Sequence, residues 1–286
     1  DRYATSISGR SSYQNRRKEL PLNRAFIGAA LLFLVTIIGI VPHIGIAISA
    51  ITESWYMTKL PTKISVSAFG QITSHPLTAL SINNSLIYSL GSTFIDLLLG
   101  GTIAWLLARS SIKTKSLLNI LSSLPLAVPG IILAFSYLGA FADTILDPRK
   151  DPTAILVIGY AIRRLPLMVR SAYVGLNQIP ITFEESAANL GARFLTIARK
   201  ILLPLAFPHL ISGIIICFCF SILEVSESLI LAMKEEDYPV TKAMYTLLSR
   251  PDGVSVASAL GISLMLLMLV GYILSNFITN SRKDLR

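Results

Sequence analysis

The sequence predicts an all-α, polytopic membrane protein with about six transmembrane helices. Its 286 residues are 53% hydrophobic and only 14% charged, whereas soluble domains carry about 25% charged residues. Three stretches contain no Lys, Arg, Asp or Glu, and each exceeds the roughly 20 residues that span a bilayer as a helix. They are residues 25–50, 117–142 and 254–280. Helices are expected rather than a barrel, because a helix satisfies its own backbone hydrogen bonds in lipid and the stretches show no strand-like alternation.

Three further apolar stretches each contain one or two charged residues. They are residues 81–108 with Asp96, 153–176 with Arg163 and Arg164, and 205–233 with Glu224 and Glu227. Within the uninterrupted stretch 117–142, Pro125, Pro129 and Gly130 predict a kink or break. Six helices result.

The distribution of Lys and Arg predicts the orientation. With both termini in the cytoplasm, 18 of these residues fall inside and seven outside. The net charge of +9 is therefore a topology signal, and no basic patch on a soluble face indicates nucleic-acid binding. The predicted organisation is a cytoplasmic arm or linker at 1–24, a transmembrane domain at 25–280 and a cytoplasmic tail at 281–286.

A short charged segment, "EESAANLGARFLTIARKILLP" at 184–204, lies between two apolar stretches. Thr182 followed by Glu185 fits a capping box that would start a helix at 183–190. Gly191 then suits the left-handed turn that ends a helix, and a second, amphipathic helix follows until a proline opens the next span. Such a helix pair can lie on anionic lipid headgroups, or it can dock on another protein.

The spacing of this segment resembles that of one family. The pattern E-A-A-x3-G-x9-I-x-L-P marks the integral-membrane subunits of binding-protein-dependent ABC importers, and Ser186 departs from it only by replacing the first alanine. The positions that match the pattern are Glu185, Ala187, Gly191, Ile201, Leu203 and Pro204.

The resemblance implies the fold of a type I ABC importer permease. It also implies that residues 180–204 form a coupling loop that docks in a groove of a cytoplasmic ATP-binding subunit. The residues expected at this contact are Glu184, Glu185, Ser186, Ala187, Gly191, Ile201, Leu203 and Pro204.

The same resemblance implies the other parts of the system. They are two ATP-binding subunits, a second permease half that is fused upstream or separate, an extracytoplasmic substrate-binding protein, and the lipid of a bacterial inner membrane. The sequence contains no G-x-x-x-x-G-K-[ST] motif, so ATP and Mg²⁺ are expected on the partner subunits. The chain itself is expected to be a transport subunit without a cofactor, and not an enzyme.

Further stretches are similar to one branch of these permeases. "LEVSESLIL" and "YPVTKAMYTLLSRPDG" resemble the iron(III), thiamine, phosphonate and polyamine branch. The first 22 residues resemble the linker that joins two fused halves in iron(III)-type permeases, so the chain is expected to be such a C-terminal half or a separate subunit. The predicted substrate is iron(III) or another small charged solute, with polyamine, thiamine and phosphonate as alternatives.

Three acidic residues within the predicted spans are candidates for the lining of the translocation path. Charges in a span usually face a cavity or a partner, and Glu224, Glu227 and Asp96 are the candidates. The alternatives are that the glutamates pair with Arg163 or Arg164, and that Asp96 makes a helix contact. A proton-coupled secondary transporter that uses these three acids is the alternative class, although no convincing internal repeat supports it.

Overall fold

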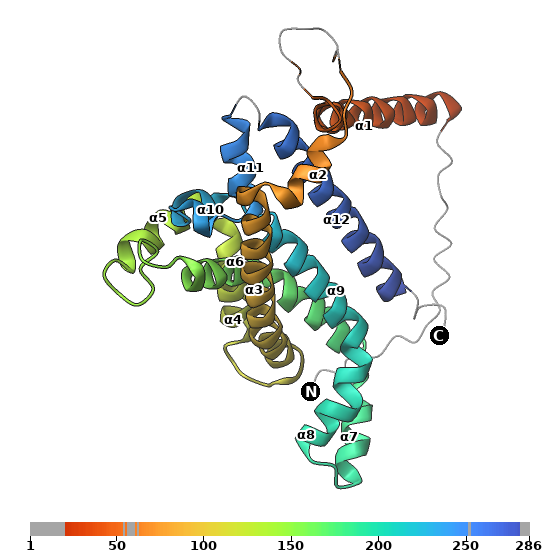
Figure 1. Cartoon of the computed structure of the whole chain (residues 1–286). Helices are drawn as coiled ribbons and strands as arrows, with labels where there is room; N and C mark the ends of the chain where they lie inside the picture. The colour runs from red at the N-terminus through yellow and green to blue at the C-terminus, as the bar shows by residue number, and fades with distance from the viewer. Residues whose placement is uncertain (1–20, 54, 56–60, 62, 251–252, 281–286) are drawn as a thin grey trace. The chain divides into compact units, whose positions relative to one another are not determined.

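The structure, a computed structural model, describes residues 21–53, 55, 61, 63–250 and 253–280. The predicted arm at 1–24 lies outside these residues except for its last four, and the tail at 281–286 lies wholly outside them. The described part is helical (Figure 1), apart from loops and an isolated bridge between Thr52 and Ile64. The helices are α1 (Leu22–Ala50), α2 (Ser67–Ser74), α3 (Pro76–Arg109), α4 (Lys115–Ser123), α5 (Gly130–Ala140), α6 (Thr153–Asn177), α7 (Ile181–Asn189), α8 (Phe194–Ile197), α9 (Leu203–Ile222), α10 (Ser226–Leu231), α11 (Val240–Leu248) and α12 (Val254–Asn280).

The chain divides into two compact units, Asp1–Gly45 and Ile46–Arg286. The described part of the first unit is the larger portion of α1. This helix carries no charge after Arg24 and contains Pro42. A proline is tolerated inside a membrane helix because neighbouring groups can satisfy the freed backbone carbonyl.

The all-α, polytopic class is confirmed. In the described residues, four helices are long and apolar enough to cross a membrane, or five if a bent pair is one span. Fewer than six helices meet this description because α6 carries Arg163, Arg164 and Arg170. Helix α6 is nevertheless helical over the whole predicted stretch.

The break predicted at Pro125, Pro129 and Gly130 is also present. The segment Lys115–Ala127 and helix α5 form an angle of 99°. The stretch 117–142 is therefore bent, as the sequence predicted.

The stretch predicted as one span at 205–233 is also broken. Helix α9 ends at Ile222, and α10 begins at Ser226. Glu224 lies in the turn between them, and its carboxylate accepts hydrogen bonds from the backbone N–H groups of Ser226 at 2.9 Å and Glu227 at 3.3 Å. These bonds satisfy N–H groups at the start of a new helix, which a carboxylate acceptor favours.

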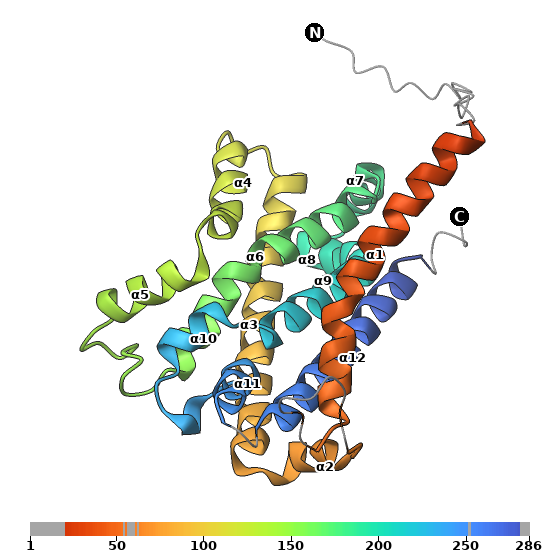
Figure 2. The ribbon, with the colours of Figure 1, turned by 90° about the horizontal axis from the view of Figure 1, so that it is seen from above.

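Helices α3, α6 and α9 pack against one another in the second unit (Figure 2). Small residues allow this approach, as is usual between membrane helices. A Cβ atom on Gly100 of α3 would lie 2.7 Å from Cγ of Met168 on α6, and one on Gly175 of α6 would lie 2.7 Å from Cβ of His209 on α9.

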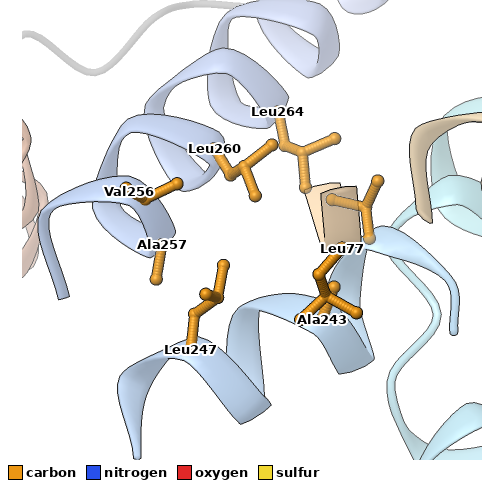
Figure 3. Packing of buried hydrophobic residues seen from close by; sticks show 8 residues of the cluster. Leu77, Ala243, Leu247, Val256, Ala257, Leu260 and Leu264 are labelled. Carbon is orange, nitrogen blue, oxygen red and sulfur yellow. The ribbon is translucent and has the colours of Figure 1, made fainter. Parts of the chain in front are cut away.

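An apolar cluster holds α11 and the start of α12 on the first turn of α3 (Figure 3). Its buried residues are Leu77, Val240, Ala243, Leu247, Val256, Ala257, Leu260 and Leu264. Because this cluster fixes α11, Thr241 of that helix can donate a hydrogen bond to the backbone carbonyl of Glu224. The cluster therefore supports the break between α9 and α10.

Candidate functional site

The segment 180–204, called the helical tip from here on, contains α7, α8 and the start of α9. It lies at the N-terminal end of α9, away from α10 and α11 (Figure 1). The predicted capping box is wrong, since α7 begins at Ile181 and no side chain caps it. Pro180 adopts an extended ψ of 134° and starts the helix directly. Thr182 therefore lies inside the first turn, where it is past the capping position.

The prediction that Gly191 forms the left-handed turn at the end of a helix is confirmed. Its φ is +83°, a conformation that glycine adopts without steric strain. The Gly191 N–H donates to the carbonyl of Ala188 at 2.9 Å, and the Ala192 N–H donates to that of Ala187 at 3.0 Å. These two bonds form a Schellman motif. No atom lies within 4 Å of a Cβ built on Gly191, so the turn requires glycine for its backbone and not for packing in this chain.

The second half of the helical tip runs directly into a long helix. Helix α8, a π-helical turn at Ala198–Leu202 and α9 follow without a break, and together they form the candidate span Phe194–Ile222. The expectation that Pro204 opens a new span is therefore wrong. Pro204 lies in the first turn of α9, directly after the π-helical turn.

The residues expected at the coupling contact divide into two groups. Glu185, Ser186, Gly191, Leu203 and Pro204 are exposed, whereas Glu184, Ala187 and Ile201 are partly buried against the rest of the chain. Large apolar side chains are also exposed on the helical tip, with Leu190 at 89% and Leu195 at 76%. Exposed apolar groups of this kind indicate a contact with protein or lipid.

Arg109 ties the helical tip to the long helices. It ends α3, and its Nε donates to Oε1 of Glu184 at 2.5 Å. Its Nη2 donates to the carbonyls of Leu176 at 2.9 Å and Ile179 at 2.8 Å. Leu176 lies in the last turn of α6, where helices leave acceptors without an internal partner, and Ile179 lies just after the C-cap residue Gln178. One buried arginine therefore joins α3, α6 and α7.

A second set of charges lies inside the fold. The buried charge cluster consists of Arg163 and Arg164 on α6, Glu224 in the turn, and Glu227 on α10. Arg164 Nη2 donates to Oε2 of Glu224 and, at 2.8 Å, to the carbonyl of Phe220. Arg163 Nη1 lies 3.7 Å from Oε1 of Glu224, and its Nε lies 3.9 Å from Oε1 of Glu227. The pairing of the glutamates with these arginines, one of the two readings of the sequence, is therefore present.

Two glycines make room for the cluster. A Cβ atom on Gly130 would overlap the guanidinium of Arg163, and one on Gly159 would overlap the carboxylate of Glu227. Gly130 is the first residue of α5, directly after the 99° break. The cluster therefore lies where the two broken helices meet α6.

Asp96 is the third acid predicted for the path. It is fully buried on α3, and within the described residues neither carboxylate oxygen has a hydrogen-bond partner of normal geometry. All three acids are thus buried within this chain, and a role in lining a path formed with a second chain stays a prediction.

Comparison with known proteins places this geometry in context. The profile of a family described as "Binding-protein-dependent transport system inner membrane component" matches residues 97–283. The molybdate/tungstate transport system permease WtpB of Pyrococcus abyssi is 30% identical over 206 residues, which are 68% of this chain and 80% of the relative. The molybdenum transport system permease ModB of Escherichia coli K12 is 28% identical over 193 residues, 63% of this chain and 84% of the relative.

A ferric transport system permease and two solved structures are also similar. FbpB of Actinobacillus pleuropneumoniae is 30% identical over 190 residues, which are 66% of this chain but 27% of that protein. A bacterial ABC transporter that imports the polysaccharide alginate has a chain with a TM-score of 0.63 and 20% identity, covering 88% of this chain and 95% of that one. A chain of the MetNI methionine ABC transporter gives a TM-score of 0.56 and 18% identity, covering 72% of this chain and 98% of its own length.

Proposed function

This chain belongs to the family of binding-protein-dependent transport system inner membrane components, the permease subunits of ABC importers, and we propose that it forms half of a path for a tetrahedral oxyanion. Molybdate and tungstate are the first candidates, because the relatives named for them match most of their own length. Iron(III), predicted from the sequence, is the second candidate, because the ferric permease is 30% identical over the part that it shares.

The observation that carries the coupling role is the helical tip. It exposes Glu185, Ser186 and Leu190 around an ordered Schellman turn, and Arg109 connects its base to α3 and α6. A rigid, partly apolar projection of this kind suits docking in a groove of an ATP-binding subunit. ATP and Mg²⁺ would bind on that subunit, and hydrolysis would occur there.

The mechanism follows from the connections of the helical tip. Closure of two ATP-binding subunits around ATP would draw together the tips of two permease halves. Arg109 would pass the movement of α7 to α3 and α6, and the continuous helix from Phe194 to Ile222 would pass it to α9. The path would then open outward to receive substrate from the binding protein, and hydrolysis would return it inward-facing. This is the reciprocal coupling expected when two sites bias one two-state element.

A glycine substitution tests the coupling role. A β-branched residue at Gly191 must adopt a φ of +83°, which costs L-residues about 1–2 kcal/mol. Gly191→Val should insert in the membrane but lose stimulation of ATP hydrolysis by the binding protein, and lose transport. Gly191→Asn is the matched control, because asparagine is accepted at this turn position. Normal transport by well-expressed Gly191→Val would count against docking at the helical tip.

Uptake into proteoliposomes tests the substrate. With ATP inside and the loaded binding protein outside, elemental analysis should find molybdenum or tungsten accumulating with time. Accumulation of iron alone would favour the second candidate. Uptake driven by a proton gradient, in the absence of any ATP-binding subunit, would instead favour the secondary transporter that uses Glu224, Glu227 and Asp96.

The proposed orientation places the helical tip and both termini in the cytoplasm. Glu236 is 68% exposed in a short turn before α11, so Glu236→Cys should react with an impermeant thiol reagent from outside the cell. Reaction from the cytoplasmic side alone would contradict this orientation.

A further inference from the structure

A cavity of ≈ 420 Å³ lies between the end of α3, the start of α4 and the second half of α6. Five of its lining residues carry hydrogen-bond donors, and two, Leu107 and Val169, are apolar. The polar residues are Lys115, Ser116 and Asn119 from α4, and Arg170 and Tyr173 from α6. No carboxylate lines the cavity.

The two cations of this cavity are not compensated in the described part of the chain. None of the ion pairs found there includes Lys115 or Arg170. Arg109, which lies nearby at the end of α3, differs because it binds Glu184 and two carbonyls. The cavity therefore combines a local excess of positive charge with neutral donors.

The start of α4 adds to this potential. Lys115 is the first residue of the helix, and no side chain caps its N-terminus. The first N–H groups of a helix lack internal acceptors and carry a partial positive charge. Two side-chain cations and three neutral donors thus line one open pocket beside the first turn of α4.

We propose that this cavity binds a tetrahedral oxyanion. A guanidinium binds two oxygens of a phosphate-like anion at once, so Arg170 would form the fork and Lys115 would supply a second charge. The Tyr173 hydroxyl, the Asn119 amide and the Ser116 hydroxyl would donate to the remaining oxygens. The volume lies in the range of small-molecule sites. The anion is either the phosphate of an anionic phospholipid or a free inorganic oxyanion, and this site goes beyond the proposed transport function.

Thermal unfolding of the delipidated importer complex tests the proposal. Phosphatidylglycerol, inorganic phosphate and, as the zwitterionic control, phosphatidylcholine are titrated against the full complex in detergent. The cavity variant is Lys115→Gln/Arg170→Gln. The charge-matched control is Lys113→Gln/Lys150→Gln, whose two lysines are exposed and lie outside the cavity.

For the wild type and the control, phosphatidylglycerol or phosphate should raise the melting temperature, and phosphatidylcholine should not. In the cavity variant, the concentration needed for half of the shift should increase at least tenfold. A response to phosphatidylglycerol alone identifies a lipid headgroup as the source, and a response to phosphate identifies a free anion. An unshifted wild type, or a cavity variant that responds like the control, overturns the proposal.

A milder variant keeps the test valid if the double variant does not fold. Tyr173→Phe removes one neutral donor, and one hydrogen bond corresponds to roughly a 2–13-fold change in affinity. Native mass spectrometry of this variant should show correspondingly fewer bound phosphatidylglycerol molecules or phosphates. An unchanged count at every ligand concentration would also contradict the site.

Discussion

The helical tip and the buried charge cluster use the same arrangement in two different environments. In each, an arginine on a long helix donates hydrogen bonds both to backbone carbonyls and to a carboxylate. Arg109 donates to carbonyls in and just after the last turn of α6, and to Glu184 on the following α7. Arg164 donates to the carbonyl of Phe220 near the end of α9 and to Glu224 just before α10. Each arginine therefore secures the end of one helix to the start of the next.

The difference between the two regions lies in what surrounds the pair. At the helical tip, one face of α7 is open and the neighbouring Glu185 is exposed. Around Arg164, a second arginine and Glu227 fill the remaining space, and Glu227 is completely buried. Both arginine side chains are 8% exposed, but the Glu184 side chain is 18% exposed and that of Glu224 is 5% exposed. Breaking a buried pair leaves an uncompensated charge and costs about 3–5 kcal/mol, and the more exposed carboxylate of Glu184 can rehydrate more readily. We call the Arg164–Glu224 pair the fixed joint and the Arg109–Glu184 pair the adjustable joint.

The largest expected effect comes from breaking the fixed joint. Glu224→Ala leaves Arg164 buried without its carboxylate and should destabilise the protein by about 3–5 kcal/mol. Size-exclusion chromatography and thermal unfolding of detergent-purified protein should show little folded material.

A double substitution and an isosteric substitution give the controls. Arg164→Met/Glu224→Met removes both charges and should recover much of the folding, because apolar replacement of a buried pair is often neutral or stabilising. If Glu224→Gln folds normally but fails to transport, Glu224 has a role in the path beyond its pairing with Arg164. If Glu224→Ala folds as well as the wild type, the fixed joint is not required.

A change at the adjustable joint should affect the coupling to ATP hydrolysis more than it affects folding. Arg109→Gln loses the ion pair with Glu184 and the bonds to two carbonyls, and hydrogen bonds to charged groups contribute about 1.5–3 kcal/mol. We expect a lower melting temperature, and ATP hydrolysis that no longer responds to the binding protein. Lys113→Gln, an exposed site nearby, is the control, and full coupling in Arg109→Gln would show that the tip is held by other contacts.

A third change acts on the contact between α3 and α6 that connects the two joints. Gly100→Ala would place a Cβ atom 2.7 Å from Met168 Cγ, and overpacking costs about 1–3 kcal/mol. Because Met168 Cβ at 2.9 Å and the Val169 backbone N at 3.3 Å are also close, movement of the methionine's flexible end does not relieve the contact, and we expect the full range of about 1–3 kcal/mol, measured by thermal unfolding. The adjacent Gly101→Ala is a matched control, since no atom lies within 4 Å of its Cβ position. Equal melting temperatures for the two variants would contradict the tight contact.

The smallest effect is expected at an arginine–carboxylate pair outside both joints. In the loop between α5 and α6, the hydrogen bonds from Arg149 hold the pKa of Asp147 well below its usual range. A lowered pKa means that the stabilisation is present above the unfolded pKa of about 4 and is lost as the pH falls below it. Asp147→Asn should therefore lower the melting temperature slightly at pH 7, and the difference from the wild type should shrink below about pH 4. A difference that does not depend on pH would contradict this account.

Most of the helices could be predicted from the sequence because long apolar stretches impose them. The break at Pro129 and the turn at Gly191 could also be predicted, since proline and glycine restrict or permit particular backbone angles. The capping box at Thr182 failed because Pro180 starts α7 earlier. The break after Ile222 was missed because its cause is tertiary: Glu224 reaches the N–H groups of α10, and its carbonyl is bound by Thr241 from a distant helix.

The partners of the two arginines could not be predicted from the sequence either, because they are also set by tertiary packing. The sequence marks Arg109 as the end of a span and Glu184 as part of the motif, but it does not place them together. Arg163 and Arg164 were natural partners for the buried glutamates, yet only the packing of α6 against α10 shows which arginine binds which acid.

The absence of a break between the helical tip and α9 has a mechanical consequence. The helix from Phe194 to Ile222 has 29 residues, and at 1.5 Å per residue it is about 43 Å long. A tilt of one degree about the helical tip would displace the far end of a helix of that length by about 0.75 Å. A flexible linker at Pro204 would have absorbed such a tilt. The helical path instead continues through the π-helical turn, although Pro204 and Pro208 each remove one backbone N–H donor from it. If the helix tilts as one body, a few degrees at the helical tip would displace the far end by a few ångströms.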